Sequence, residues 1–116
     1  MGCGDVGGRV AALLRPGVRL LALTPTAGRV DALRAMGIVP LLGNLDVPAS
    51  VRRLSGLATR VVHLAPPAPQ GVSDARTRAL MRILQRRTAP RAVVYGSTSG
   101  VYGDCAGVWV DETRAL

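Results

Sequence analysis

Four short apolar runs, separated by segments of helical pattern, constrain the fold of this 116-residue chain more than any other feature. Runs of this length and Val/Leu content are typical of strands buried on both faces of a sheet. Pro40 weakens the second run as a strand, because proline cannot donate to a sheet ladder. The predicted strands are VRLLALTP (18–25), IVPLL (38–42), RVVHLA (60–65) and RAVVYGSTSG (91–100), which continues into a Ser/Thr-rich turn.

Helices are predicted before and between these runs, over 9–15, 29–35, 48–57 and 73–87. In the last of them, Ala79 with Ile83 and Leu80 with Leu84 have helical spacing, and Ser73 is the expected N-cap. Gly37 is a C-cap candidate for the predicted helix over 29–35. Alternating strands and helices predict parallel strands joined by right-handed crossovers. The expected fold is therefore an α/β fold with one doubly wound parallel sheet, in a single domain over residues 1–116.

The composition excludes some classes of protein. Hydrophobic residues make up 48% of the chain, which is enough for a core, and no apolar run approaches the roughly 18 residues of a membrane span. The net charge of +8 comes from 15 arginines that are spread along the chain, so a solvated surface is favoured over a nucleic-acid face. Cys3 and Cys105 lack metal-type spacing and are expected to be reduced thiols. These features predict a cytoplasmic protein without nucleic-acid or membrane partners and without a metal site.

The N-terminal residues MGCGDVGG contain the pattern G-x-G-x-x-G at Gly2, Gly4 and Gly7. The first glycine permits a tight turn, the second lets backbone approach a pyrophosphate, and the third lets the following helix pack closely. The start of that helix offers unpaired N–H groups and a partial positive charge to phosphates. The pattern is weak alone, but a helix follows it directly and a strand ends about twenty residues later. It therefore predicts a dinucleotide site.

The end of that strand bears on which dinucleotide is bound. The segment Thr24-Pro25-Thr26 has no Asp or Glu that could accept hydrogen bonds from a ribose 2′-hydroxyl. Thr24, Thr26 and Arg29 could instead accommodate a 2′-phosphate, which favours NADP over NAD. The alternative is that these residues only form the turn and begin the next helix.

Four segments, in the order GCGDVGGRVA, LLGNLD, VVHLAPP and VYGSTSGVYGD, resemble the short-chain dehydrogenase/reductase superfamily. The similarity is to its extended and atypical branches, described as NAD-dependent epimerase/dehydratase. It implies a Rossmann-like NAD(P)-binding fold and a part in an NAD(P)-dependent oxidoreductase or epimerase/dehydratase acting on an unknown small molecule. By this resemblance, Thr98 polarises the reacting oxygen of the substrate, and Asn44 replaces the family's carboxylate near adenine. The cofactor-binding residues that the glycine loop and the resemblance together imply are Gly2, Cys3, Gly4, Asp5, Val6, Gly7, Thr24, Arg29, Asn44, Leu45, Leu64, Ala65 and Pro66.

The chain departs from this family at its catalytic pair. The family uses a tyrosine with a lysine four residues later as acid/base machinery, whereas this chain contains no lysine and only two tyrosines, Tyr95 and Tyr102. A non-catalytic dinucleotide sensor is therefore a second hypothesis, and a small basic nucleic-acid binder is a third. His63 is expected to point into the packed layers rather than to act in catalysis.

The glycine motif also lacks the strand that normally precedes it. In a doubly wound sheet this strand would lie between the runs at 18–25 and 60–65, and its loss would leave their buried backbone groups unpaired. The sequence is thus expected to be a fragment whose first strand is encoded upstream and whose C-terminal part is missing. The alternative is that the sheet tolerates the loss by dimerising or rearranging.

Overall fold

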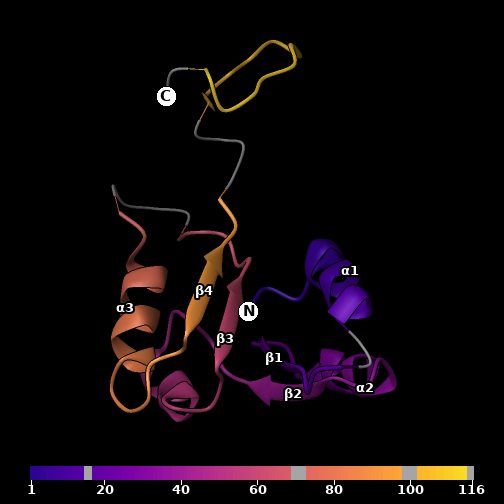
Figure 1. Ribbon diagram of the computed structural model, residues 1–116, viewed down its shortest axis with the longest axis vertical. Helices are drawn as coiled ribbons and strands as arrows, with labels where there is room; N and C mark the ends of the chain where they lie inside the picture. Colours follow the sequence, from indigo (N-terminus) through magenta and orange to yellow (C-terminus); the bar gives the residue numbers. More distant parts are fainter. Residues whose placement is uncertain (15–16, 69–72, 98–101, 115–116) are drawn as a thin grey trace.

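The computed structural model describes residues 1–14, 17–68, 73–97 and 102–114, and its helices and strands alternate along the chain (Figure 1). Each strand is four residues long, and the four strands form two parallel pairs. The elements are α1 (Asp5–Leu14), β1 (Leu21–Thr24), the 3₁₀ helix η1 (Ala27–Arg29), α2 (Val30–Ala35), β2 (Val39–Leu42), the 3₁₀ helix η2 (Pro48–Leu54), β3 (Arg60–His63), α3 (Ala75–Leu84) and β4 (Ala92–Tyr95).

The prediction of one doubly wound, Rossmann-like sheet is wrong. In the described residues the strands form two separate two-stranded sheets, β1 with β2 and β3 with β4. Both backbone groups of Met1 form hydrogen bonds along β3. Its α-amino group donates to Val62 O (2.6 Å), and its carbonyl accepts from the N–H of Leu64 (2.9 Å), the residue after the strand. A continuous sheet would need a strand bonded to both β1 and β3. The periodicity of each run indicates a strand but not which strands become neighbours.

Two apolar clusters fill the interior, and the two faces of β1 contribute to different clusters. Leu23 belongs to the larger cluster, which η2, β3 and α3 complete, while Ala22 belongs to the smaller one between α1, β1 and α2. This is the alternation expected of a strand covered on both faces. The larger cluster consists of Leu23, Val51, Leu54, Val61, Leu80, Ile83 and Leu84, and the smaller of Ala11, Ala22, Leu33 and Ile38.

Gly37 ends α2, as predicted, in a Schellman motif. Its φ of +68° is in the left-handed region, its N–H donates to Arg34 O (2.8 Å), and Ile38 N donates to Leu33 O (3.0 Å). Leu33 and Ile38 are both buried, which supplies the hydrophobic contact typical of this cap. The turn therefore directs the chain from α2 straight into β2.

The predicted helix over 48–57 is instead the 3₁₀ helix η2, and Pro40 lies on β2, opposite Ala22 of β1. β2 is an edge strand in the described residues, so the missing N–H of Pro40 can face away from the ladder. No helix in the described part of the chain has the length and apolar character needed to cross a membrane.

The N-cap of α3 is Asp74 rather than the predicted Ser73. The Asp74 carboxylate accepts from Thr77 N (3.0 Å) and Thr77 Oγ1 (2.5 Å), and Tyr95 Oη donates to it as well (3.1 Å). Burial raises the pKa of this carboxyl, but the hydrogen bonds from Thr77 and Tyr95 outweigh it and leave the pKa below its ordinary value. One carboxylate thus ties the start of α3 to the end of β4.

Asp74→Ala should therefore lower the free energy of unfolding by about 1–2 kcal/mol, the usual cost of a lost N-cap. Urea unfolding followed by circular dichroism measures this. Ser73→Ala is the matched control, because the adjacent hydroxyl does not cap the helix, and it should change stability by less than about 0.5 kcal/mol. Equal effects of the two substitutions would contradict the capping role of Asp74.

Candidate functional site

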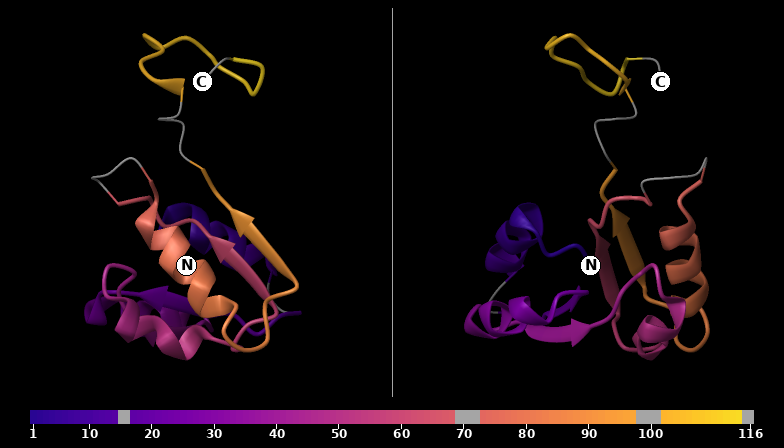
Figure 2. Two further views of the ribbon diagram at one scale, coloured as in Figure 1. Left: turned by 90° about the vertical axis from the view of Figure 1, so that its left-hand side faces the viewer. Right: turned by 180° about the vertical axis from the view of Figure 1, so that it is seen from behind.

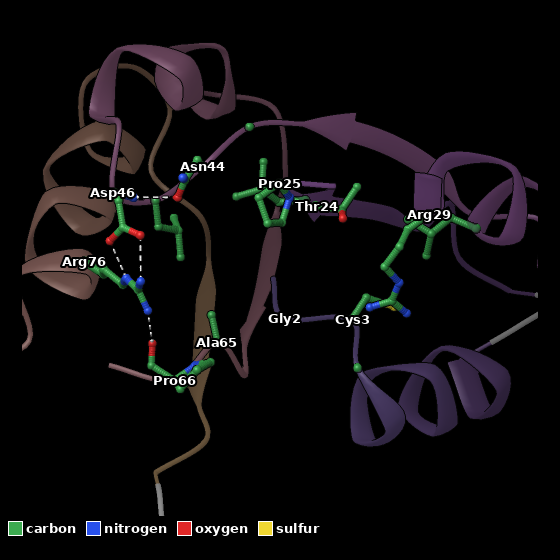
Figure 3. Close-up of a pocket in the computed structure, with 15 residues that line it drawn as sticks. Gly2, Cys3, Thr24, Pro25, Arg29, Asn44, Asp46, Ala65, Pro66 and Arg76 are labelled. Carbon is green, nitrogen blue, oxygen red and sulfur yellow. Dashed lines mark hydrogen bonds and ion pairs between the residues drawn. The ribbon is translucent and has the colours of Figure 1, made fainter. Parts of the chain in front are cut away.

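A pocket of about 310 Å³ lies where the start of α1, the end of β1 and the segments after β2 and β3 converge (Figure 3). This volume is at the lower end of the range for small-molecule sites, roughly 300–1,000 Å³. Its lining residues come from positions far apart in the sequence. They are Gly2, Cys3, Gly4, Leu23, Thr24, Pro25, Arg29, Leu33, Gly43, Asn44, Leu45, Asp46, Ala65, Pro66 and Arg76.

The three glycines of the N-terminal motif have three different environments. Gly2 has a φ of +73°, and a Cβ there would lie 2.4 Å from Ala65 N and 2.5 Å from the Leu64 carbonyl carbon. A Cβ on Gly7 would lie 2.8 Å from Gly2 O, so Gly7 packs against the turn itself rather than against a strand. Gly4 has open space at its Cβ position and lines the pocket. The turn at Gly2 therefore packs closely against the residues that follow β3, while the backbone at Gly4 is accessible.

The start of α1 borders the pocket beside Gly4. The first four N–H groups of an α-helix have no partner within the helix, and they carry the positive end of its dipole. Asp5 and Val6 do not line the pocket. Asp5 is exposed and forms a surface ion pair with Arg9 (3.1 Å) instead. From this segment the residues that line the pocket are Gly2, Cys3 and Gly4, which directly precede the helix.

Thr24 and Arg29 approach the pocket in different ways. Thr24 is buried, and its Oγ1 accepts from Thr26 N (3.3 Å), so its hydroxyl stabilises the turn after β1. Arg29 is exposed at the end of η1, and its guanidinium extends toward Cys3 at the start of α1 (Figure 3). Within the described ranges, Arg29 has no carboxylate partner in an ion pair. Its charge is available to an anionic ligand.

Asn44 stabilises the loop after β2. Its Oδ1 accepts from Asp46 N (2.9 Å), and its backbone N donates to Ser50 Oγ (2.9 Å). Ser50 in turn donates to Asn44 O (3.0 Å). These bonds hold Asn44 and Leu45 at the pocket wall. That Asn44 lies near an adenine stays a prediction from the family resemblance.

An ion pair that the sequence did not reveal closes one wall of the pocket. Arg76, in the first turn of α3, binds both carboxylate oxygens of Asp46 (2.5 and 2.6 Å) and the carbonyls of Pro66 and Pro67 (3.3 Å each). The hydrogen bonds from Arg76 keep the pKa of the Asp46 carboxyl below its ordinary value. Thirty positions separate the two residues, so no local pattern could have indicated the pair. The two charges neutralise each other and leave the positive charge of Arg29 uncompensated.

Of the remaining predicted residues, Ala65 and Pro66 line the pocket, whereas Leu64 does not and is half-buried beside Gly96. Thr98, the predicted catalytic hydroxyl, lies outside the described residues. Sequence reasoning missed the apolar lining of Leu23, Leu33 and Gly43, because each of these reads as an ordinary core or turn residue.

A second polar cluster, formed by His63, Asp74, Thr77 and Tyr95, lies between α3 and the β3–β4 sheet. His63 is 1% exposed, as its predicted packed position requires, and its Nε2 lies 2.7 Å from Thr77 Oγ1. Because Thr77 Oγ1 donates to Asp74, we assign the proton of His63 to Nε2. Its Nδ1 is then a buried acceptor with no hydrogen-bond partner among the residues that the structure describes.

Burial lowers the pKa of His63, and the nearby α-amino group of Met1 lowers it further, while Asp74 opposes both. The hydrogen bond to Asp74 raises the pKa of Tyr95. The cluster therefore holds a neutral imidazole against an ionised carboxylate and joins α3 to both strands.

Among the described residues, no group of three or more His, Cys, Asp or Glu side chains is placed to hold a metal ion. No family model, no curated protein and no solved structure matches this chain.

Proposed function

We propose that this protein binds a nicotinamide dinucleotide, NADP or NAD, with its phosphates at the start of α1. The observation that carries the proposal is the open backbone at Gly4, which lines the pocket beside unpaired helix N–H groups. Arg29 adds a positive charge on the facing side, and the segment at Asn44 and Leu45 adds a polar and an apolar surface. These are groups suited to a phosphate and to an adenosine.

The residues present fit such a ligand. Gly4 leaves space where any other residue would place a Cβ, which is what the approach of a phosphate to backbone requires. Among the described residues that line the pocket, Asp46 is the only carboxylate, and it is neutralised by Arg76 and so does not repel an anion. A pocket of about 310 Å³ has room for part of a dinucleotide, and we propose that the phosphates and the adenosine half lie in it.

We favour NADP over NAD because of Arg29. A guanidinium binds a phosphate monoester through charge-assisted hydrogen bonds, and a ribose 2′-hydroxyl is best bound by a carboxylate. No carboxylate stands at Thr24 or Thr26, and Asp46 is engaged by Arg76. The preference for the phosphorylated cofactor thus rests on a single side chain, which makes it simple to test.

Arg29→Gln should weaken the binding of NADPH about tenfold or more, because a hydrogen bond between charged groups contributes roughly 1.5–3 kcal/mol, and should leave NADH binding nearly unchanged. Isothermal titration calorimetry with both dinucleotides measures this. Arg34→Gln is the matched control: Arg34 is exposed on α2, forms an ion pair with Asp31 (3.3 Å) and does not line the pocket. No heat with either dinucleotide for the unmodified chain would overturn the proposed function, and equal losses for both dinucleotides would overturn the preference alone.

The activity that we propose is that of the cofactor-binding part of an oxidoreductase or an epimerase/dehydratase-like protein. The cofactor supplies hydride transfer, and the protein orients it. Thr98 remains the predicted group that polarises the substrate oxygen. The competing function is a non-catalytic dinucleotide sensor, which the absence of lysine from the sequence favours. Turnover of alcohols or carbonyls, measured beside dinucleotide binding, separates the two, because binding without turnover supports the sensor.

A further inference from the structure

The C-terminal residues 102–114, called the arm below, extend away from the two sheets (Figures 1 and 2). The hydrogen bonds assigned to the arm are internal to it, as in the turns at Asp104 and Asp111. Two of its apolar side chains are in solvent: Trp109 is 98% exposed and Val108 is 64% exposed. An indole this exposed, beside an exposed valine on a projecting segment, is suited to bury itself against another apolar surface.

The β3–β4 sheet offers such a surface on the face opposite α3. Val61 and His63 are buried under α3, so the alternating Val62 points to the opposite face, where it is paired in register with Val94. Val94 is 59% exposed. Arg60 lies on this same face two residues before Val62 and is also exposed. The face is therefore an apolar pair with a positive charge at one end.

The charge distribution favours contact between the arm and this face. The arm carries three carboxylates and one arginine, so its net charge is −2. The whole chain has a net charge of +8, so the rest of the chain carries +10. In the arm, Asp111 follows Trp109 by two residues, and Glu112 comes next. In an extended segment, residues two apart lie on one face about 7 Å from each other, which is also the separation of Arg60 and Val62. If the arm runs antiparallel to β3, Trp109 can therefore lie over Val62 while Asp111 lies near Arg60.

We propose that two copies of this chain associate by exchanging arms. The arm of each copy lies across the β3–β4 face of the other, with Trp109 over Val62 and Val94 and with Asp111 near Arg60. The surface and the arm that it binds belong to one chain, so a two-fold arrangement uses both contacts twice and closes without leaving a further arm exposed. The arm projects beyond the sheet that precedes it (Figure 2), which places it to reach a second molecule.

The chain contains a single tryptophan, so its fluorescence reports directly on the proposed contact. Sedimentation equilibrium of the full chain should give a concentration-dependent monomer–dimer equilibrium, and the emission of Trp109 should shift to the blue over the same concentrations. Trp109→Ser should weaken dimerisation about 30-fold or more, as expected for an interface tryptophan that contributes at least about 2 kcal/mol. Trp109→Phe, which keeps an aromatic ring, should retain most of the association.

Charge reversal tests the orientation of the arm. Arg60→Asp and Asp111→Arg should each weaken the dimer by about threefold or more at low salt, and the double variant should recover the loss. Leu13→Ser is the matched control, because Leu13 is also a strongly exposed apolar residue (85%) but lies on α1, and the substitution should leave the dimer unchanged. A monomer with exposed tryptophan emission at all concentrations would overturn the proposal. So would a blue shift that is independent of concentration in a monomer, because the arm would then be packed on its own chain.

Discussion

Gly2→Ala should lower the free energy of unfolding by about 2–5 kcal/mol. A left-handed backbone costs a residue with a Cβ about 1–2 kcal/mol, and overpacking of a filled site costs about 1–3 kcal/mol more. Both apply at Gly2, where φ is +73° and the new Cβ would meet the backbone of Leu64 and Ala65 at 2.4–2.7 Å. Backbone atoms of the two residues that directly follow β3 cannot move aside as a flexible side chain can. Chemical unfolding followed by circular dichroism measures the loss.

Gly4→Ala is the control that separates folding from binding. Its Cβ would meet nothing within 4 Å, so stability should change by less than about 0.5 kcal/mol. The same methyl group would project into the space that we assign to a phosphate, so dinucleotide binding should fall about tenfold or more. If Gly4→Ala destabilised the fold as much as Gly2→Ala, the distinct roles of the two glycines would be wrong. If it left dinucleotide binding intact, the phosphate would have to lie elsewhere.

Acidification from pH 7 to pH 5 should destabilise the protein through His63. The ordinary pKa of histidine is 6.5, and burial lowers the pKa of His63 in the folded state. The unfolded chain therefore takes up a proton below pH 6.5 that the folded chain does not, so the stability present above pH 6.5 is lost as the pH falls toward the folded pKa. The slope is at most about 1.4 kcal/mol per pH unit for this one group. A proton on Nδ1 would have no acceptor in the described structure, which is why the folded state resists it.

His63→Gln removes this titration while keeping an N–H that can donate to Thr77 Oγ1. We expect the variant to be less stable at pH 7 and to have a flatter dependence of unfolding free energy on pH between 5 and 6.5. Of the groups that face His63, Asp74 has a lowered pKa and loses its contribution only below about its ordinary value of 3.8, outside this range of pH. Burial lowers the pKa of the Met1 α-amino group from 8.0, and this group is present in both proteins. Identical profiles for the two proteins between pH 5 and 6.5 would rule out His63 as the acid-sensitive group.

The local elements were predictable where the sequence pattern acts over a few residues. The apolar run at 18–25 contains β1, the spacing of Leu80 and Leu84 lies on α3, and Gly37 ends α2, because hydrophobic period and backbone freedom are local properties. The predicted N-cap of α3, Ser73, was wrong by one residue, because Asp74 caps the helix. Either side chain can cap a helix, and the choice depended on Thr77 and Tyr95, which Asp74 also contacts.

The sequence alone determined that parallel strands alternate with helices and that a glycine turn begins the first helix. Only the tertiary structure decided that the strands form two separate pairs, because the backbone hydrogen bonds that join strands depend on which segments meet. The hydrophobic period of a segment does not indicate which other segment will lie beside it. The same holds for the pocket, where Asp46 and Arg76 meet across thirty positions to form one wall. Charge pairing of this kind arises from proximity in space, which is fixed only when the chain has folded.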